Sequence, residues 1–342
     1  MADFEVSDPR FNPPGTPTVP SKPPRDELPP VEPPSAGFIM QLFVVPALIV
    51  LAVVAVWALF GRIASAEQDW RSLVAELRSG NEHRRWRAAL GLAQMLKGDQ
   101  EKGEKGEGLA RNPQVCKELS SLLEEQLGKT TSRKDDLKQQ AFLARTLGFL
   151  DLPEVVLPVL VKATDAQNDI DVRRNSLASL ALVLGRADER KEHPATSETV
   201  DRLIEVTSDP ELQIRQLAVY CLGLIPEEAA RDHLKWVVDN DSQDATVRAN
   251  AAVALSRQHS KAGLGYLRTV LKEAAAAKPA DTKLYVDSVT IRNAIKSVQT
   301  LRGDMTDAER TEVAGLLEPI AAHYPDDRLQ LDARAALAEL RQ

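Results

Sequence analysis

The sequence predicts an all-α protein: an α-solenoid of about seven helical hairpins, preceded by one transmembrane helix and a disordered proline-rich tail. Three observations support this architecture. One helical pattern recurs along most of the chain, one long segment carries no charge, and eleven of the 21 prolines lie in residues 1–37. The expected domains are therefore the tail at 1–37, the membrane helix at 38–60 and the solenoid at 61–342.

The tail is rich in proline at polyproline spacing. Pro14, Pro17, Pro20 and Pro23 recur every third residue, which is the period of polyproline II. We expect an extended, disordered tether. Alternatively, these short motifs could make the tail a ligand for a proline-binding module.

Residues Phe38 to Phe60 form a segment of 23 residues without a charged side chain. At about 1.5 Å of rise per residue, a helix of this length can cross a hydrocarbon core of about 30 Å. Trp57 stands near one end, where membrane helices favour aromatic side chains. The alternative is an export signal cleaved after Ala66, but the apolar segment is longer than the core of such a signal.

Basic residues near the ends of this segment predict its orientation. Lys22 and Arg25 precede the segment, whereas Arg62, Arg71 and Arg78 follow it. Because cytoplasmic flanks carry the excess of Lys and Arg, we expect a single-pass membrane protein with its repeat domain in the cytoplasm.

Helical periodicity then alternates with short turn signals, and no sustained strand pattern interrupts it. A charged insertion at 97–112, rich in Glu, Lys and Gly, is expected to be flexible. First helices of the hairpins are expected at 67–78, 113–127, 153–163, 197–207, 227–238, 261–276 and 307–323. Second helices are expected at 82–96, 137–150, 170–184, 211–224, 245–257, 288–301 and 327–340.

Six of the second helices align in one register. Position 0 is occupied by Arg85, Gln140, Arg173, Arg215, Arg248 and Ile291. Polar residues suited to capping a helix stand four residues earlier, at Asn81, Asp136, Asp169, Glu211, Asp244 and Asp287. Positions +3, +4 and +7 share one helical face, which carries small residues first and mostly Leu at +7. This face is the predicted core, and each acid–Arg pair is expected to cap its helix or link neighbouring hairpins.

The stretches from Asp209 to Gly223 and from Asp244 to Leu255 resemble the HEAT-repeat superfamily, in particular the short bacterial units of the phycobilisome-lyase type. This resemblance covers about residues 67–342. The resemblance implies a right-handed solenoid. Together with the uncharged segment, it leads us to expect a non-enzymatic scaffold that is anchored in a membrane. The resemblance does not specify a partner.

Two enzyme classes built on such repeats give an alternative function: a bilin lyase or a metal hydroxylase. The hydroxylases use repeated His-Glu pairs as metal ligands, and none of the five histidines here is followed by Glu. No phosphate-binding glycine loop, nucleophile motif or zinc spacing is present either. We therefore expect no enzymatic activity and no cofactor.

The expected function is to bind a protein partner on the concave side of the solenoid, where second helices expose side chains at positions +1 and +5. Aromatic residues and Arg dominate binding hot spots. A net charge of −7 argues against nucleic acid, which proteins bind through Lys and Arg. The candidate binding residues are Trp86, Leu90, Arg145, Arg174, Tyr220, Arg292 and Lys296.

Overall fold

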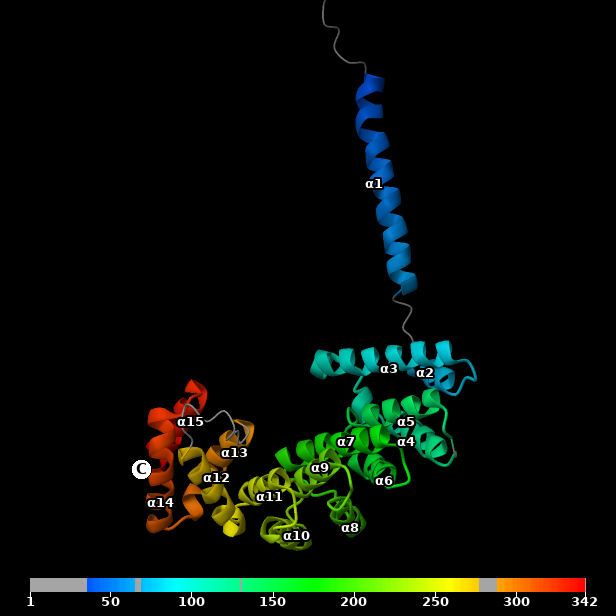
Figure 1. The fold of residues 1–342 in the computed structure, drawn as a ribbon. Helices are drawn as coiled ribbons and strands as arrows, with labels where there is room; N and C mark the ends of the chain where they lie inside the picture. Colours follow the sequence, from blue (N-terminus) through cyan, green and yellow to red (C-terminus); the bar gives the residue numbers. More distant parts are fainter. Residues whose placement is uncertain (1–35, 65–68, 130, 277–287, 342) are drawn as a thin grey trace, which may run out of the picture. The chain divides into compact units, whose positions relative to one another are not determined.

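The structure is a computed structural model that describes residues 36–64, 69–129, 131–276 and 288–341 (Figure 1). The chain divides into two compact units, residues 1–67 and residues 68–342. The proline-rich tail, Ala66 and Asp287 lie outside the described residues.

Helix α1 (Ala36–Ala64) is the described part of the first unit. It contains the whole segment predicted to cross a membrane, although the side chains at both ends of that segment lie outside the described residues. Among the described residues, no helix combines the length and the apolar character of a membrane span.

The second unit consists of seven antiparallel helical hairpins, and every helix pair falls where the sequence pattern predicts it. Within residues 69–129, 131–276 and 288–341 no β-strand occurs. The first helices are α2 (Trp70–Leu77), α4 (Pro113–Leu127), α6 (Pro153–Ala163), α8 (Ser197–Val206), α10 (Glu228–Asp239), α12 (Leu264–Ala276) and α14 (Asp307–His323). The second helices are α3 (Glu82–Lys102), α5 (Lys134–Leu147), α7 (Ile170–Glu189), α9 (Leu212–Leu222), α11 (Ala245–Arg257), α13 (Ser288–Thr300) and α15 (Asp327–Leu340).

The segment 97–112 has more helical structure than its composition predicts. Helix α3 continues to Lys102, and two short 3-10 helices follow, η1 (Gly103–Lys105) and η2 (Leu109–Arg111). The carboxylate of Asp99 holds this segment, because it accepts hydrogen bonds from the backbone N–H groups of Glu107 and Leu109. Buried carboxylates that receive backbone donors fix a loop as a cap fixes a helix end.

The hairpins stack in two layers. From α5 to α15, each second helix packs against the next second helix, and α4, α6, α8 and α10 form the corresponding row of first helices. Figure 1 shows α7, α9 and α11 side by side, with α6, α8 and α10 in the other layer. This arrangement of repeated hairpins is the α-solenoid that the sequence predicts.

The predicted core register is confirmed at every aligned position. All side chains at +3, +4 and +7 of α3, α5, α7, α9, α11 and α13 are buried, with at most 4% of their surface exposed. Helical periodicity places these three positions on one stripe, so a single buried stripe defines the rotation of each helix.

Some of the predicted capping residues cap their helix, whereas others contact a different hairpin. Asn81, Asp169 and Asp244 accept a hydrogen bond from a first-turn backbone N–H, as predicted. Asp136 does not cap α5, because that helix begins earlier, at Lys134; the carboxylate instead pairs with Arg85 of the preceding hairpin at 3.7 Å.

The side chain at position 0 usually donates a hydrogen bond to a backbone carbonyl within its own hairpin. Nε of Arg248 donates to the carbonyl of Val238 at the end of α10 over 2.8 Å. Nε2 of Gln140 donates in the same way to Gln126 at the end of α4 over 2.9 Å. A long polar side chain here satisfies carbonyls that the end of a helix leaves without an intrahelical partner.

Between consecutive second helices runs a seam of small residues. Position +8 of one helix meets position +6 of the next, and these positions hold Gly148 against Ser179 and Gly223 against Ala254. A β-carbon added at Gly148 would lie 2.6 Å from Oγ of Ser179. Small residues in this seam therefore set how closely neighbouring hairpins approach.

His233 on α10 is half-buried and gives the fold a pH-dependent contact. Oγ1 of Thr207 donates its hydrogen to the carbonyl of Ile204, so it accepts from Nε2 of His233 at 2.8 Å. The imidazole also stacks on Trp236, with ring centroids 5.3 Å apart. Burial lowers the pKa of His233 below its ordinary value of 6.5.

This shift predicts that stability declines in acid. The unfolded chain takes up a proton at His233 more readily than the folded chain, so the stabilisation is complete above about pH 6.5 and is lost as the pH falls through the lowered folded pKa. We expect the urea midpoint of His233→Gln to lose less between pH 8 and pH 5 than that of the natural protein. An unchanged pH dependence in the variant would contradict this assignment.

Candidate partner-binding site

Three of the seven candidate residues line one groove between α3, α5 and α7, which we call the Trp86 groove. It encloses a cavity of about 520 Å³. Its lining consists of Trp86, Lys134, Leu137, Lys138, Ala141, Phe142, Arg145, Asp169, Asp171, Arg174 and Asn175. The groove thus brings Trp86, Arg145 and Arg174 together from three successive second helices.

Two aromatic rings form the apolar part of the Trp86 groove. The rings of Trp86 and Phe142 meet edge to face, with centroids 6.4 Å apart and an interplanar angle of 73°. Trp86 is still 39% exposed, so part of the indole remains open to a ligand. A rigid, half-open aromatic pair offers a large contact area at low entropic cost.

The charged residues around the groove differ in how far they are already paired. Arg174 pairs with Asp171 at 2.5 Å, and Lys138 pairs with Asp135 at 3.5 Å. Lys134 and Arg145 have no acidic partner within the described part of the chain. These two cations are therefore available to an acidic ligand.

The other four candidates lie elsewhere on the second helices. Leu90 on α3 is 61% exposed and Tyr220 on α9 is 45% exposed. The guanidinium of Arg257 lies over the Tyr220 ring, 4.9 Å from its centroid. Lys296 on α13 is exposed, whereas Nε of Arg292 donates to Asp332 of the next hairpin over 2.9 Å. Arg292 thus joins two hairpins, a contact that its sequence position did not reveal.

Positions −2, +2, +5 and +9 point away from the core stripe on each second helix, and we call their solvent-accessible side chains the second-helix face. The candidate residues were predicted at positions +1 and +5, which do not include Phe142 at +2 or Leu182 and Arg257 at +9. Helical periodicity could have identified them, because all three lie opposite the buried stripe.

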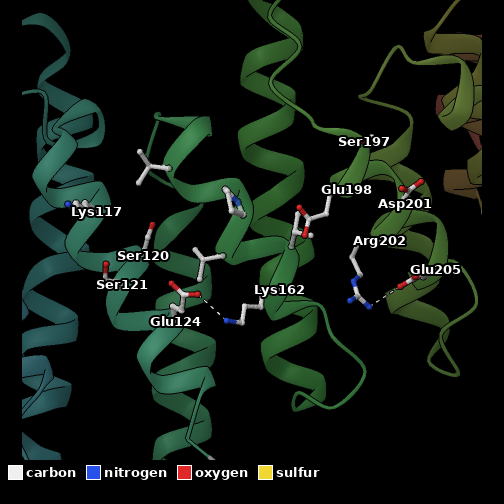
Figure 2. A pocket seen from close by; sticks show the side chains of 14 residues that line it. Lys117, Ser120, Ser121, Glu124, Lys162, Ser197, Glu198, Asp201, Arg202 and Glu205 are labelled. Carbon is white, nitrogen blue, oxygen red and sulfur yellow. Dashed lines mark hydrogen bonds and ion pairs between the residues drawn. The ribbon is translucent and has the colours of Figure 1, made fainter.

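A second groove lies on the first helices and was not predicted. Its cavity of about 680 Å³ is bounded by α4, α6 and α8 (Figure 2). Helix α6 contributes the apolar residues Val155, Pro158 and Val159 to the lining, together with Lys162. Figure 2 shows Glu124 of α4 directed toward Lys162, with which it pairs at 3.0 Å, and Arg202 directed toward Glu205.

Both basic and acidic side chains line this second groove. Lys117 stands on one wall, while Glu198 and Asp201 stand on the other (Figure 2). The buried hydroxyl of Ser120 has no hydrogen-bond partner in the described part of the chain. The recess is lined by three successive first helices, whose placement relative to one another no local pattern in the sequence reports.

The described residues offer little for metal or thiol chemistry. No group of three His, Cys, Asp or Glu side chains among them is arranged to hold a metal ion. Burial raises the pKa of the Cys116 thiol to about 11 and that of Cys221 to about 12. Sγ of Cys221 occupies a +6 seam position and donates to the carbonyl of Leu177 over 3.4 Å, which accounts for this cysteine as a small packing residue.

Comparison with known proteins identifies the repeat. The family model described as HEAT repeats matches residues 157–256. A comparison with curated proteins gives no significant match.

Several solved structures are similar to this chain. An engineered protein has 17% identity and a TM-score of 0.46, over 80% of this chain and 78% of that one. The complex of CpcE and CpcF of phycocyanin lyase from Nostoc sp. PCC7120 has 16% identity and a TM-score of 0.44, over 81% and 96%. A designed armadillo repeat protein in complex with the peptide (KR)4 has 13% identity and a TM-score of 0.38, over 80% and 100%.

The matched segment contains three of the aligned second helices, with Arg173, Arg215 and Arg248 at position 0. The family match therefore falls on the register that the sequence predicts. Residues 157–256, which span the hairpins from α6 to α11, thus match the HEAT-repeat family.

Proposed function

We propose that this protein is a non-catalytic adaptor that holds a protein partner on its second-helix face. The observation that supports this most directly is the Trp86 groove, where an open aromatic pair adjoins Arg145 and Lys134, two cations without acidic partners among the described residues. Trp and Arg in a recess shielded by neighbouring side chains are the usual composition of an interface hot spot.

Photo-cross-linking tests this proposal directly, because the photoreactive side chain forms a covalent bond with whichever protein contacts it. We expect a benzoylphenylalanine at Leu90 or Tyr220 in the full chain to form a protein adduct in cells. The same residue at Trp236, which is 51% exposed on the first helix α10, is the matched control and should form far less. Adducts from position 236 alone, or equal adducts from all three positions, would place the interaction elsewhere.

We also propose that α1 anchors the adaptor in a membrane, with the repeats on the cytoplasmic side. The sequence supports this by its 23 uncharged residues from Phe38 to Phe60. In addition, large aliphatic side chains from Val44 to Val56 are 45–66% exposed, in every direction around the helix. Such a helix in water would carry a large hydration cost, which lipid or another apolar surface removes.

Two measurements test the anchor. The full chain should stay in the membrane pellet at alkaline pH, and a reporter enzyme that works only outside the cytoplasm should be inactive when fused after Gln342. An active reporter would reverse the orientation. A mature protein that begins at Glu67 would instead support the exported, cleaved alternative.

A further inference from the structure

The two helical layers carry opposite charge, although the chain as a whole is acidic. The seven first helices contain 9 Lys and Arg against 16 Asp and Glu. The seven second helices contain 18 Lys and Arg against 11 Asp and Glu. The net charge of −7 therefore conceals a basic second-helix layer.

The positive charge is exposed on the second-helix face. On the six aligned second helices, five basic side chains occupy the outward positions, against the single carboxylate of Asp171, which pairs with Arg174. The five are Arg87, Lys138, Arg145, Arg257 and Lys296. Arg87, Arg145 and Lys296 have no ion-pair partner among the described residues, so their charges are not neutralised within the chain.

Apolar side chains are interspersed with these cations. Leu90 is 61%, Leu182 50% and Tyr220 45% exposed, and each lies on a different second helix. The open part of Trp86, at position +1 on the edge of this face, adds a further apolar contact. Isolated exposed apolar residues are common, but a row of them beside unpaired cations fits one kind of partner.

We propose that the second-helix face binds an extended, acidic protein segment that carries aliphatic or aromatic side chains between its Asp and Glu residues. One apolar side chain of this segment enters the Trp86 groove beside Phe142, and neighbouring carboxylates pair with Arg145 and Lys134. Charge complementarity selects the acidic segment and speeds its association. The proposal rests on the proposed function, because it assumes that this face is the binding surface.

Nucleic acid fits these observations less well. The Trp86 groove holds one aromatic pair whose rings meet edge to face, rather than a series of stacking platforms for successive bases. The cations are also separated by exposed leucines, whereas single-stranded nucleic acid favours a continuous basic path beside stacking platforms. Nucleic acid is therefore included as a competing ligand in the binding experiment.

The test measures fluorescence anisotropy with the full chain in detergent and three labelled probes. These are the peptide (Glu-Leu-Asp)4, its neutral counterpart (Gln-Leu-Asn)4 and a 12-nucleotide oligo-dT. We expect the acidic peptide to bind at least about tenfold more tightly than the neutral one at 50 mM NaCl. Most of that difference should disappear at 500 mM NaCl, because salt screens exposed charges.

Charge reversal identifies the surface that binds. Arg145→Glu should weaken binding of the acidic peptide about tenfold or more, since it replaces an attraction by a repulsion. Lys235→Glu is the matched control, because Lys235 is exposed on the first helix α10 and its reversal changes the net charge equally. Arg145 has no ion pair to lose among the described residues, so the thermal unfolding curves of both variants should match the natural protein.

The outcomes separate this proposal from the proposed function. Equal binding of the two peptides, no binding of either, or binding of oligo-dT alone would overturn the acidic-segment proposal. A cross-link from Leu90 or Tyr220 would still support the adaptor function in each of these cases. Absence of that cross-link would instead remove the surface on which both proposals depend.

Discussion

Replacing Leu222 by alanine should lower the free energy of unfolding by about 2–5 kcal/mol, the usual cost of deleting most of a buried leucine. Leu222 is the +7 residue of α9 and has no exposed surface. Its neighbours on the same stripe, Ala218 and Val219, are equally buried, so they leave little freedom to fill the cavity. Urea denaturation of the repeat region measures the loss.

Tyr220→Ala is the matched control for this prediction, because it lies only two residues away on the same helix. The tyrosine is 45% exposed and contacts Arg257 through its ring face. Loss of such an exposed cation–π contact costs about 0.5–1 kcal/mol. Comparable losses for the two variants would show that the assigned rotation of α9 is wrong.

Gly223→Ala should also be strongly destabilising, by about 1–3 kcal/mol, although it adds a single methyl group. The added β-carbon would lie 2.6 Å from Cβ and 3.1 Å from Cα of Ala254 on the next second helix. Backbone atoms cannot rotate away as a long side chain can, so α9 and α11 must separate. Gly223 has φ −64°, a helical value that alanine adopts freely, and the predicted cost is therefore steric.

Gly315→Ala provides a control with the opposite expected sign. Gly315 lies in the middle of α14, and an added β-carbon there meets nothing within 4 Å. Alanine is favoured over glycine in a helix by about 0.8–1 kcal/mol, so this variant should gain stability. If Gly223→Ala also gained stability, the small-residue seam would not limit the approach of neighbouring hairpins.

The helices and their buried stripes were predictable because both follow from local periodicity. Leu255 at +7 and Ala251 at +3 are buried as the pattern requires, since a period of 3.6 residues determines which side chains share a face. Helix caps also depend on residues that are close in the sequence. Asp244, for example, accepts a hydrogen bond from a backbone N–H in the first turn of α11. The end of α3 was the exception, because Asp99 stabilises the segment after it through residues up to ten positions away.

The candidate site was predictable only in part. Sequence periodicity selected Trp86, Arg145 and Arg174, but it could not show that they line one groove while Arg292 pairs with Asp332. Those relations depend on the rotation and offset between successive hairpins. The small residues at Gly148 and Gly223 contribute to both, through contacts about 30 residues apart in the sequence.

The sequence alone therefore determined the helical hairpins, their core register and the repeat pattern that the HEAT-repeat family matches at residues 157–256, because each depends on residues within a few turns of one another. The tertiary structure decided which exposed side chains meet, including the Phe142 ring beside Trp86 and the groove between α4 and α8. The physical reason is that stacking joins residues from different hairpins, and their distances depend on packing between helices that no local period encodes.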